Sequence, residues 1–188
     1  MRIALVAPSG VPFTVGGAEK LWWGLTAYVN RHTAHAMELV KLPSPERNLR
    51  EIVQSYRQFA ALTLDHFDLV ISTKYPAWMV RHDNHVVYLQ HRLRGLYDTY
   101  PQDLPLRPAK LPPSLQPLWN LLQAPQLGRT ALPELFERLD ALWSSRDVPE
   151  DARNALLAFP GPFARAVVHA LDRIGLAPDA IRRYLAIS

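Results

Sequence analysis

Short apolar runs alternate with longer amphipathic stretches through the first half of the chain. Such runs, bounded by charged or turn residues, are typical of strands buried on both faces of a sheet. Proline-rich turns are expected to end the first strand at Pro8-Ser9-Gly10 and the second at Pro43-Ser44-Pro45. We predict four such strands, at Arg2–Ala7, Ala36–Leu42, Asp68–Thr73 and Val86–Leu89.

Two of the stretches between these strands carry apolar residues at helical spacing. The first helix is expected to begin at the Gly-Gly pair, and the second to run from Glu46 to about Leu64. We predict Trp22 and Trp23 to be packing groups, not platforms for a sugar. The predicted stripes are Leu21, Trp22, Leu25, Tyr28 and Val29 in the first helix, and Ile52, Val53, Tyr56, Phe59, Ala60 and Thr63 in the second. Strands alternating with helices predict an α/β fold with a Rossmann-like, doubly wound parallel sheet.

The alternating pattern stops where prolines become frequent, from Pro101 onward. Proline prevents a helix or an inner strand from continuing, so an extended excursion with a short helix at Leu118–Gln123 is expected. Helical spacing returns over Leu132–Trp143 and Phe163–Ile174. We therefore predict a single lobe, with its core at about 1–100 and 178–188 and a proline-rich, helical insertion at about 101–177.

The chain closes on an apolar run, Tyr184–Ser188, which predicts a last strand. Before it, Gly175 is expected to end a helix, and Pro178 to begin a short helical turn. Natural domains seldom stop on an apolar strand without a polar tail. We therefore expect the natural protein to continue beyond this strand.

The stretch Val15-Gly16-Gly17-Ala18-Glu19 separates the first predicted strand from the first predicted helix. Two adjacent glycines allow the backbone to pass through positive φ and leave no Cβ to obstruct a ligand. The unpaired N–H groups and the positive dipole end of the helix that follows would favour an anion. A loop-to-helix transition without a ligand explains the same residues.

A second candidate segment, Lys74–Trp78, follows the carboxyl end of the third strand, where ligands bind in open α/β sheets.

The composition, with 48% hydrophobic and 20% charged residues, is that of a folded protein. No apolar run approaches the roughly 20 residues that cross a bilayer. Because there is no cysteine, disulfides, thiolate zinc sites and cysteine catalysis are excluded.

The net charge of +4 and the pI of about 9.6 come from interspersed charges. This mild bias is compatible with steering of phosphorylated substrates or lipid headgroups, or with a solvated face, but it is no nucleic-acid signature.

Other arrangements that carry chemistry are poorly supported by the sequence. His82 and His85 stand in an apparent loop without a defined third ligand, so a metal site is not predicted. A triad of Ser9, His91 and an aspartate lacks the Gly-x-Ser-x-Gly elbow. The Gly-Gly pair has neither the Lys-Ser or Lys-Thr of a P-loop nor the Gly-x-Gly-x-x-Gly of a dinucleotide-binding fold.

The order of these motifs resembles the amino-terminal domain of family-4 (group 1) glycosyltransferases of the GT-B architecture. Three elements carry the resemblance: the Gly-Gly-Ala-Glu element Gly16–Glu19 at the head of the first helix, the segment Tyr88–Asp98 after the fourth strand, and the closing strand Tyr184–Ser188. The segment from Pro101 to Ala177 matches nothing specific. The resemblance implies an enzyme that transfers a hexose from a nucleotide-diphosphate sugar to a glycan, lipid or small-molecule acceptor with retention of configuration.

The resemblance also implies how the lobe would work. No metal or other cofactor would be required, and the partners would be the nucleotide-sugar donor, the acceptor and a carboxyl-terminal donor-binding lobe that this chain lacks. The chain alone would be inactive. Gly16, Gly17, Gln90 and Arg94 would line the diphosphate and acceptor side of the cleft. Because the sequence has no bilayer-crossing run and no signal-peptide core, we expect a cytoplasmic protein, with a peripheral contact to the inner face of the membrane and no nucleic-acid partner.

The family places a histidine after the fourth strand, where it reaches the donor sugar. If Arg94 and Tyr97-Asp98 fix the register, that position falls on Gln90, and His91 stands one residue later. Adjacent strand residues point to opposite faces, so both cannot fill the role unless the strand has already ended. We assign the catalytic role to His91, and Gln90 is the open alternative. The explanation without a function is that His91 is a hydrogen-bonded polar residue at the end of a strand.

A second function of a different class fits the same sequence. A Rossmann-like domain without catalytic activity could use its basic, proline-rich excursion to dock a protein partner or an anionic membrane surface. The two hypotheses differ in what they expect downstream, because a further domain of ~150–200 residues that contains a Glu-x7-Glu pattern would favour the transferase.

Overall fold

The computed structural model describes residues 1–186 and divides the chain into two compact units. The first unit comprises Met1–Arg92 and the segment from Leu176 onward, and the second comprises Leu93–Gly175. The chain therefore leaves the first unit after its fourth strand and returns for the fifth.

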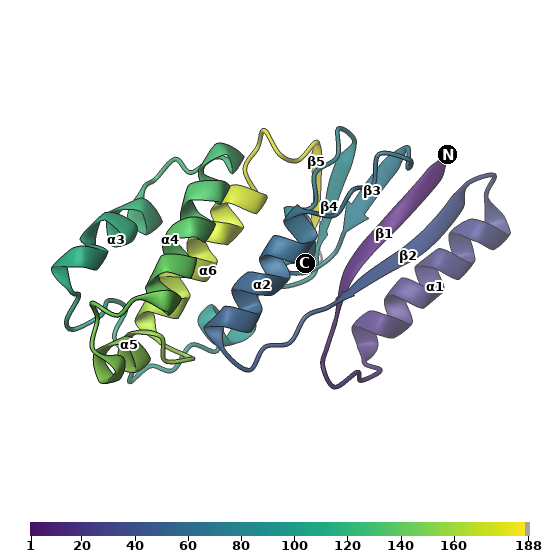
Figure 1. The fold of residues 1–188 in the computed structure, drawn as a ribbon. Helices are drawn as coiled ribbons and strands as arrows, with labels where there is room; N and C mark the ends of the chain where they lie inside the picture. Colours follow the sequence, from purple (N-terminus) through teal and green to yellow (C-terminus); the bar gives the residue numbers. More distant parts are fainter. Residues whose placement is uncertain (187–188) are drawn as a thin grey trace. The chain divides into compact units, whose positions relative to one another are not determined.

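The first unit is built on a parallel sheet of five strands in the order β2-β1-β3-β4-β5 (Figure 1). This is the flavodoxin-like order of doubly wound sheets. The α/β fold with a parallel sheet is thus confirmed. The strands are β1 (Arg2–Ser9), β2 (Ala36–Pro43), β3 (Leu69–Ser72), β4 (His85–Leu89) and β5 (Arg183–Ala186). Of the predicted last strand, Ile187 and Ser188 lie outside the described residues.

The first strand continues through Pro8, where the sequence predicted its end. The carbonyl of Arg2 accepts from Asp68 N on the β3 side, and the carbonyl of Ser9 accepts from Ser44 N on the β2 side. Even-numbered residues of β1 therefore direct their peptide groups toward β3, and Pro8 is one of them. Because β3 ends at Ser72, which pairs with Val6, the missing N–H of Pro8 costs no ladder hydrogen bond.

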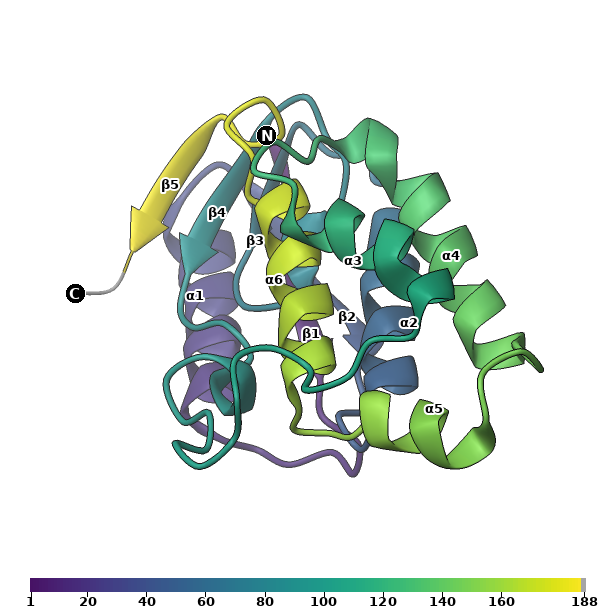
Figure 2. The same ribbon diagram turned by 90° about the vertical axis from the view of Figure 1, so that its left-hand side faces the viewer.

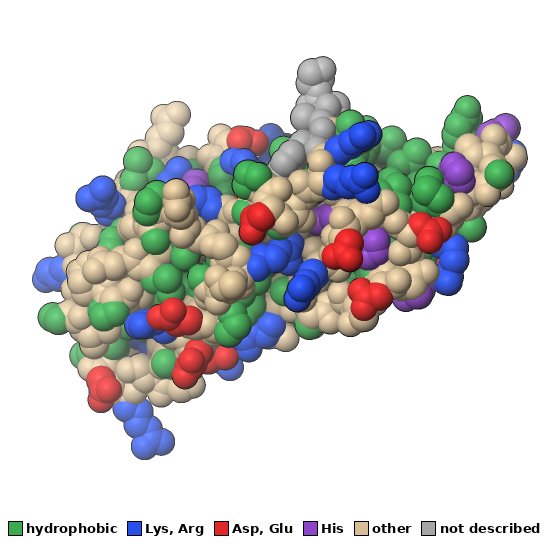
Figure 3. Space-filling view, turned by 90° about the horizontal axis from the view of Figure 1, so that it is seen from above, with side chains coloured by type: hydrophobic (Ala, Val, Ile, Leu, Met, Phe, Trp, Pro, Cys, Tyr) green, Lys and Arg blue, Asp and Glu red, His purple; other side chains and the backbone are tan. Residues whose placement is uncertain are grey.

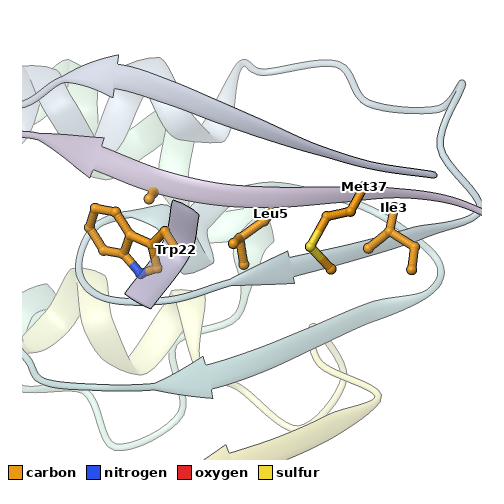
Figure 4. Close-up of a cluster of buried hydrophobic side chains, with 5 residues drawn as sticks. Ile3, Leu5, Trp22 and Met37 are labelled. Atoms are coloured by element: carbon orange, nitrogen blue, oxygen red, sulfur yellow. The ribbon is translucent and has the colours of Figure 1, made fainter. Parts of the chain in front are cut away.

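Helix α1 (Gly17–His32) packs on one face of the sheet through Ala18, Trp22, Leu25 and Val29. Trp22 is fully buried against Ile3, Leu5, Ala7 and Met37, and Figure 4 shows this cluster beneath β1. The predicted stripe was partly wrong, since Leu21 is 39% exposed and Tyr28 62%. Trp23, predicted to pack, is 44% exposed. Leu21 and Trp23 each lie about 100° round the helix from the buried Trp22, and Tyr28 lies about 100° from the partly buried Val29.

Helix α2 (Leu49–Ala60) buries Ile52, Val53, Tyr56 and Phe59, as predicted. It packs against β2 and the 3₁₀ turn η1 (Ala77–Met79), on the face of the sheet opposite α1 (Figure 2). The helix is shorter than predicted at both ends. The Asn48 side chain accepts a hydrogen bond from Glu51 N and caps the first turn, which is why the helix begins after Asn48 and not at Glu46.

The second unit is helical. Its 3₁₀ turns are η2 (Arg94–Leu96), η3 (Pro113–Leu115) and η4 (Arg129–Ala131), and its helices are α3 (Gln116–Gln123), α4 (Leu132–Ser144), α5 (Glu150–Leu156) and α6 (Pro162–Gly175). Helix α3 contacts both α4 and α6 (Figure 1). Prolines stand in the first turn of α3 and α4, where a missing N–H costs nothing. Helix α5 was not predicted, and Gly175 ends α6 as expected.

Charged side chains of both signs are interspersed on the face shown in Figure 3. This agrees with the scattered charges of the sequence. None of the helices over residues 1–186 is long and apolar enough to cross a membrane.

Candidate functional site

The strand order places a topological switch point at the carboxyl end of the sheet. From the central strand β1 the chain passes to β2 through α1, whereas β3 lies on the other side of β1. In open α/β sheets, ligands bind in the crevice outside the carboxyl ends of the strands that flank such a point. The segments that follow β1, β3 and β4 at this edge include the Gly-Gly element, Lys74 and the pair Gln90-His91.

The Gly-Gly element forms the start of α1. Gly16 is the N-cap, with φ −112° and ψ −167°, and its N–H donates to Glu19 Oε2 at 3.0 Å. Neither glycine has a positive φ, so the structure does not use the backbone freedom that the pair allows. The pair instead leaves space, because a Cβ added at Gly17 would meet no atom within 4 Å. With the Gly16 N–H bonded to Glu19, the N–H groups of Gly17 and Ala18 remain for a ligand.

Glu19 is a buried carboxylate at this helix start, 7% exposed. Burial alone would raise the pKa of its carboxyl. The N–H groups of Gly16 and of Glu19 itself, together with the charges of Lys41 and Lys74, lower the pKa below its ordinary value. Glu19 is therefore ionised at neutral pH, and one negative charge stands beside two positive ones.

Lys41 and Lys74 form the cationic part of the edge. Lys41 Nζ lies 3.7 Å from Glu19 Oε1, too long for a hydrogen bond, and 4.7 Å from the Phe13 ring centroid. The ring centroid of Trp22 lies 5.2 Å from Lys41 Nζ and 5.6 Å from Lys74 Nζ, so the ring is close to both ammonium groups. Aromatic faces attract cations without supplying hydrogen-bond acceptors. Within the described part of the chain, Lys41 Nζ is buried and has no hydrogen-bond partner.

Backbone hydrogen bonds hold Gln90 and His91 beside the segment that carries Lys74. Gln90 N donates to Thr73 O at 3.2 Å, and Tyr75 N donates to His91 O at 3.5 Å. Because β4 ends at Leu89, both residues lie beyond the strand, and the strict alternation of faces does not apply to them. The structure thus brings Gln90, His91 and Lys74 to one edge.

The two candidate side chains differ in their surroundings. His91 Nδ1 donates to the carbonyl of Arg92 at 2.8 Å, which leaves Nε2 as the acceptor of the neutral ring. Both polar atoms of the Gln90 amide are buried and lack a partner among residues 1–186. Arg94, the remaining predicted site residue, begins η2 and belongs to the second unit.

Sequence reasoning missed the part played by Lys41. Lys41 lies within the predicted second strand, Ala36–Leu42, and was not among the predicted site residues. A charged residue inside a strand otherwise patterned for burial is the signal that could have identified it, since such a charge requires a partner. The acidic residue of the Gly-Gly-Ala-Glu element supplies that partner.

The histidines near β4 have protein partners. Ser72 Oγ and His85 Nε2 are joined by a buried hydrogen bond of 2.8 Å across β3 and β4. His82 Nε2 donates to the carbonyl of Phe67, and its Nδ1 accepts from Asn84 N. No group of three His, Asp or Glu side chains suited to a metal ion occurs among the residues described.

The first unit is thus a doubly wound parallel α/β domain. Lys41 and Lys74 make the edge of the sheet at the carboxyl ends of its strands cationic. A scan against protein-family models and searches of curated proteins and of solved structures found no match to the chain.

Proposed function

We propose that the chain is the amino-terminal, acceptor-side domain of a retaining, nucleotide-sugar-dependent glycosyltransferase of the GT-B architecture. The observation that carries the proposal is the meeting of Lys41, Lys74 and the open start of α1 at the switch point of a parallel sheet. The resemblance of Gly16–Glu19 and Tyr88–Asp98 to family-4 enzymes supports the same reading. The reaction would transfer a hexose to a glycan, lipid or small-molecule acceptor.

The chemistry follows from charge. In sugar transfer from a nucleotide diphosphate, negative charge develops on the departing diphosphate, and fixed donors and cations that face it lower the barrier. The N–H groups of Gly17 and Ala18 and the ammonium groups of Lys41 and Lys74 would provide this stabilisation. Glu19 would hold Lys41 in place and leave a net positive charge at the edge.

His91 is proposed to contact the donor sugar. With Nδ1 bonded to the Arg92 carbonyl, a neutral His91 presents Nε2 as an acceptor for a sugar hydroxyl. Gln90 is the alternative, because its buried amide has hydrogen-bonding capacity that no group in the described chain uses. A carboxyl-terminal lobe would hold the nucleotide.

The test compares two glycine variants in the product of the complete gene. Gly17→Val would place a branched side chain at the proposed diphosphate seat. Gly24→Val is the matched control, because it lies on the same helix and an added Cβ also meets nothing within 4 Å. We expect sugar-nucleotide turnover to fall with Gly17→Val and to persist with Gly24→Val. Undiminished transfer by Gly17→Val would contradict the role of the helix start.

A non-catalytic binding module is the second candidate. It is favoured by the loop between β1 and α1, where Val11, Phe13 and Val15 are 47%, 53% and 52% exposed. Exposed apolar side chains in one loop are typical of docking surfaces. If the complete gene product turned over no sugar nucleotide, and Phe13→Ser abolished sedimentation with anionic vesicles or capture of a protein partner, this function would replace the first.

A further inference from the structure

Helix α6 of the second unit carries a basic stripe. Arg165, His169 and Arg173 follow one another at intervals of four residues, so they lie on one face of the helix. The other face is apolar and buried, with Phe163, Val167, Ala170, Leu171 and Ile174 in the core of the unit. From this stripe His169 and Arg173 donate hydrogen bonds to the carbonyls of Leu96 and Leu122.

This stripe borders a hollow of about 200 Å³. Arg107 and Leu106 from the proline-rich segment, Gln123 from the end of α3, and Ala166 complete the lining, which contains no acidic side chain. The hollow is smaller than the ~300–1,000 Å³ of sites for drug-sized ligands. It is suited to one small charged group.

The charges around the hollow are not neutralised within the protein. In the described chain, Arg107, Arg165 and Arg173 form no ion pair. Arg173 donates only to neutral carbonyls, those of Leu122 at 2.5 Å and Ala124 at 3.4 Å. Three guanidinium groups therefore share a small space without a counter-charge.

Arg165 also has unused hydrogen-bonding capacity. Its guanidinium lies over the Tyr100 ring, 5.5 Å from the centroid, and its buried Nε has no hydrogen-bond partner among residues 1–186. Burial raises the pKa of Tyr100, while the charge of Arg165 opposes that shift and the charge of Asp103 adds to it. Asp103 is thus an acid close to Tyr100, yet it forms no ion pair with Arg165.

His169 is held in a fixed orientation at the same hollow. Its Nε2 donates to the carbonyl of Leu96 at 3.1 Å, and its ring stacks on Tyr97 with the centroids 3.9 Å apart and the planes at 9°. Tyr97 in turn donates its hydroxyl hydrogen to Asp172 Oδ2 at 2.7 Å. The wall of the hollow is therefore preorganised.

We propose that this hollow, the arginine pocket of Arg107, Arg165, His169 and Arg173, binds a phosphate monoester. Guanidinium forks match phosphate oxygens, and a monoester carries about −1.5 to −2 charge at pH 7, which offsets roughly one half to two thirds of the charge of three arginines. A carboxylate would offset only one of the three. The site lies wholly within the second unit and does not rest on the proposed sugar transfer.

The monoester can belong to a small molecule or to a lipid headgroup, and the test separates these sources. Glycerol 3-phosphate is titrated into the whole chain by calorimetry, and vesicles containing phosphatidic acid are tested by sedimentation. Saturable binding of the soluble probe assigns a small phosphorylated molecule, and binding to vesicles alone assigns a lipid headgroup. Binding to neither probe overturns the proposal.

Variants show whether binding occurs at the pocket. Arg107→Gln and Arg165→Gln are each expected to weaken binding about tenfold or more, because each removes charged hydrogen bonds to the ligand. Arg146→Gln, an exposed arginine of the same unit outside the hollow, is the matched control and should bind as the wild type does. Arg107 is itself exposed, so its variant keeps the test valid if Arg165→Gln fails to fold. Equal weakening by Arg107→Gln and Arg146→Gln would overturn the assignment.

Discussion

Lys41 Nζ lies 3.7 Å from Glu19 Oε1, and this contact joins strand β2 to the first turn of α1. Glu19 also accepts the N–H of Gly16, so one carboxylate both caps the helix and holds a lysine at the sheet edge. The pair combines a structural and a candidate functional role. Its energetics can be tested without substrate.

Glu19→Gln is expected to reduce the free energy of unfolding at pH 7 by about 1 kcal/mol, because glutamine keeps the cap but loses the charge that faces Lys41 and Lys74. The pKa of Glu19 is lowered by folding, so its charge stabilises the protein above the unfolded pKa, and this stabilisation is lost as the pH falls through the folded pKa. Urea unfolding of both proteins at pH 7 and at a pH below 4 measures the difference. A gap that stays constant with pH would contradict an electrostatic origin.

Trp22 and Trp23 provide a matched pair for the core. Trp22→Ala is expected to cost about 3–5 kcal/mol, because it removes a fully buried indole from the cluster with Leu5 and Met37. Trp23→Ala, at a position 44% exposed, should cost well under half as much. Chemical denaturation of the two variants checks the order, and similar losses would contradict the observed face of α1.

Lys74→Met is expected to weaken pyrophosphate binding to the chain by roughly three- to tenfold, since it removes one of two cations at the helix start. Lys110→Met, an exposed lysine of the second unit, is the control and should have no effect. Titration at two salt concentrations measures both variants. Binding of pyrophosphate should weaken as salt rises, because added ions screen the ammonium charges.

Gln90 and His91 can be separated by kinetics in the product of the complete gene. If His91 contacts the donor sugar in the transition state, His91→Ala should lower kcat by about 10²-fold or more, whereas Gln90→Ala should act mainly on KM. Steady-state measurement of sugar-nucleotide turnover decides between them. The reverse pattern would assign the role to Gln90.

Much of the sheet could be predicted because its signal is local. The apolar runs at Leu5, Met37, Val70 and Val87 do become parallel strands, because a strand buried on both faces leaves a continuous apolar run. Ile52 and Tyr56 do face the core, because a helix buried on one face leaves a recognisable period. Boundaries were less well predicted. The continuation of β1 through Pro8 depends on which neighbour stands beside it, and that information is absent from the local pattern.

The candidate site was predicted only in part for a related reason. Gly17, Gln90 and His91 stand next to element ends, where spacing along the chain is informative. Lys41 is 22 positions from Glu19, so no local spacing relates them. The choice between Trp22 and Trp23 likewise depended on the rotation of α1 about its axis.

The pattern of apolar runs, glycines and prolines was sufficient for the class of fold, because burial of the backbone requires hydrogen-bonded elements of recognisable period. Only the tertiary structure decided the order of the strands and the pairing of Lys41 with Glu19. Side-chain charges far apart in sequence interact only after the strands are ordered, and their strength there depends on a burial that exists only in the packed protein.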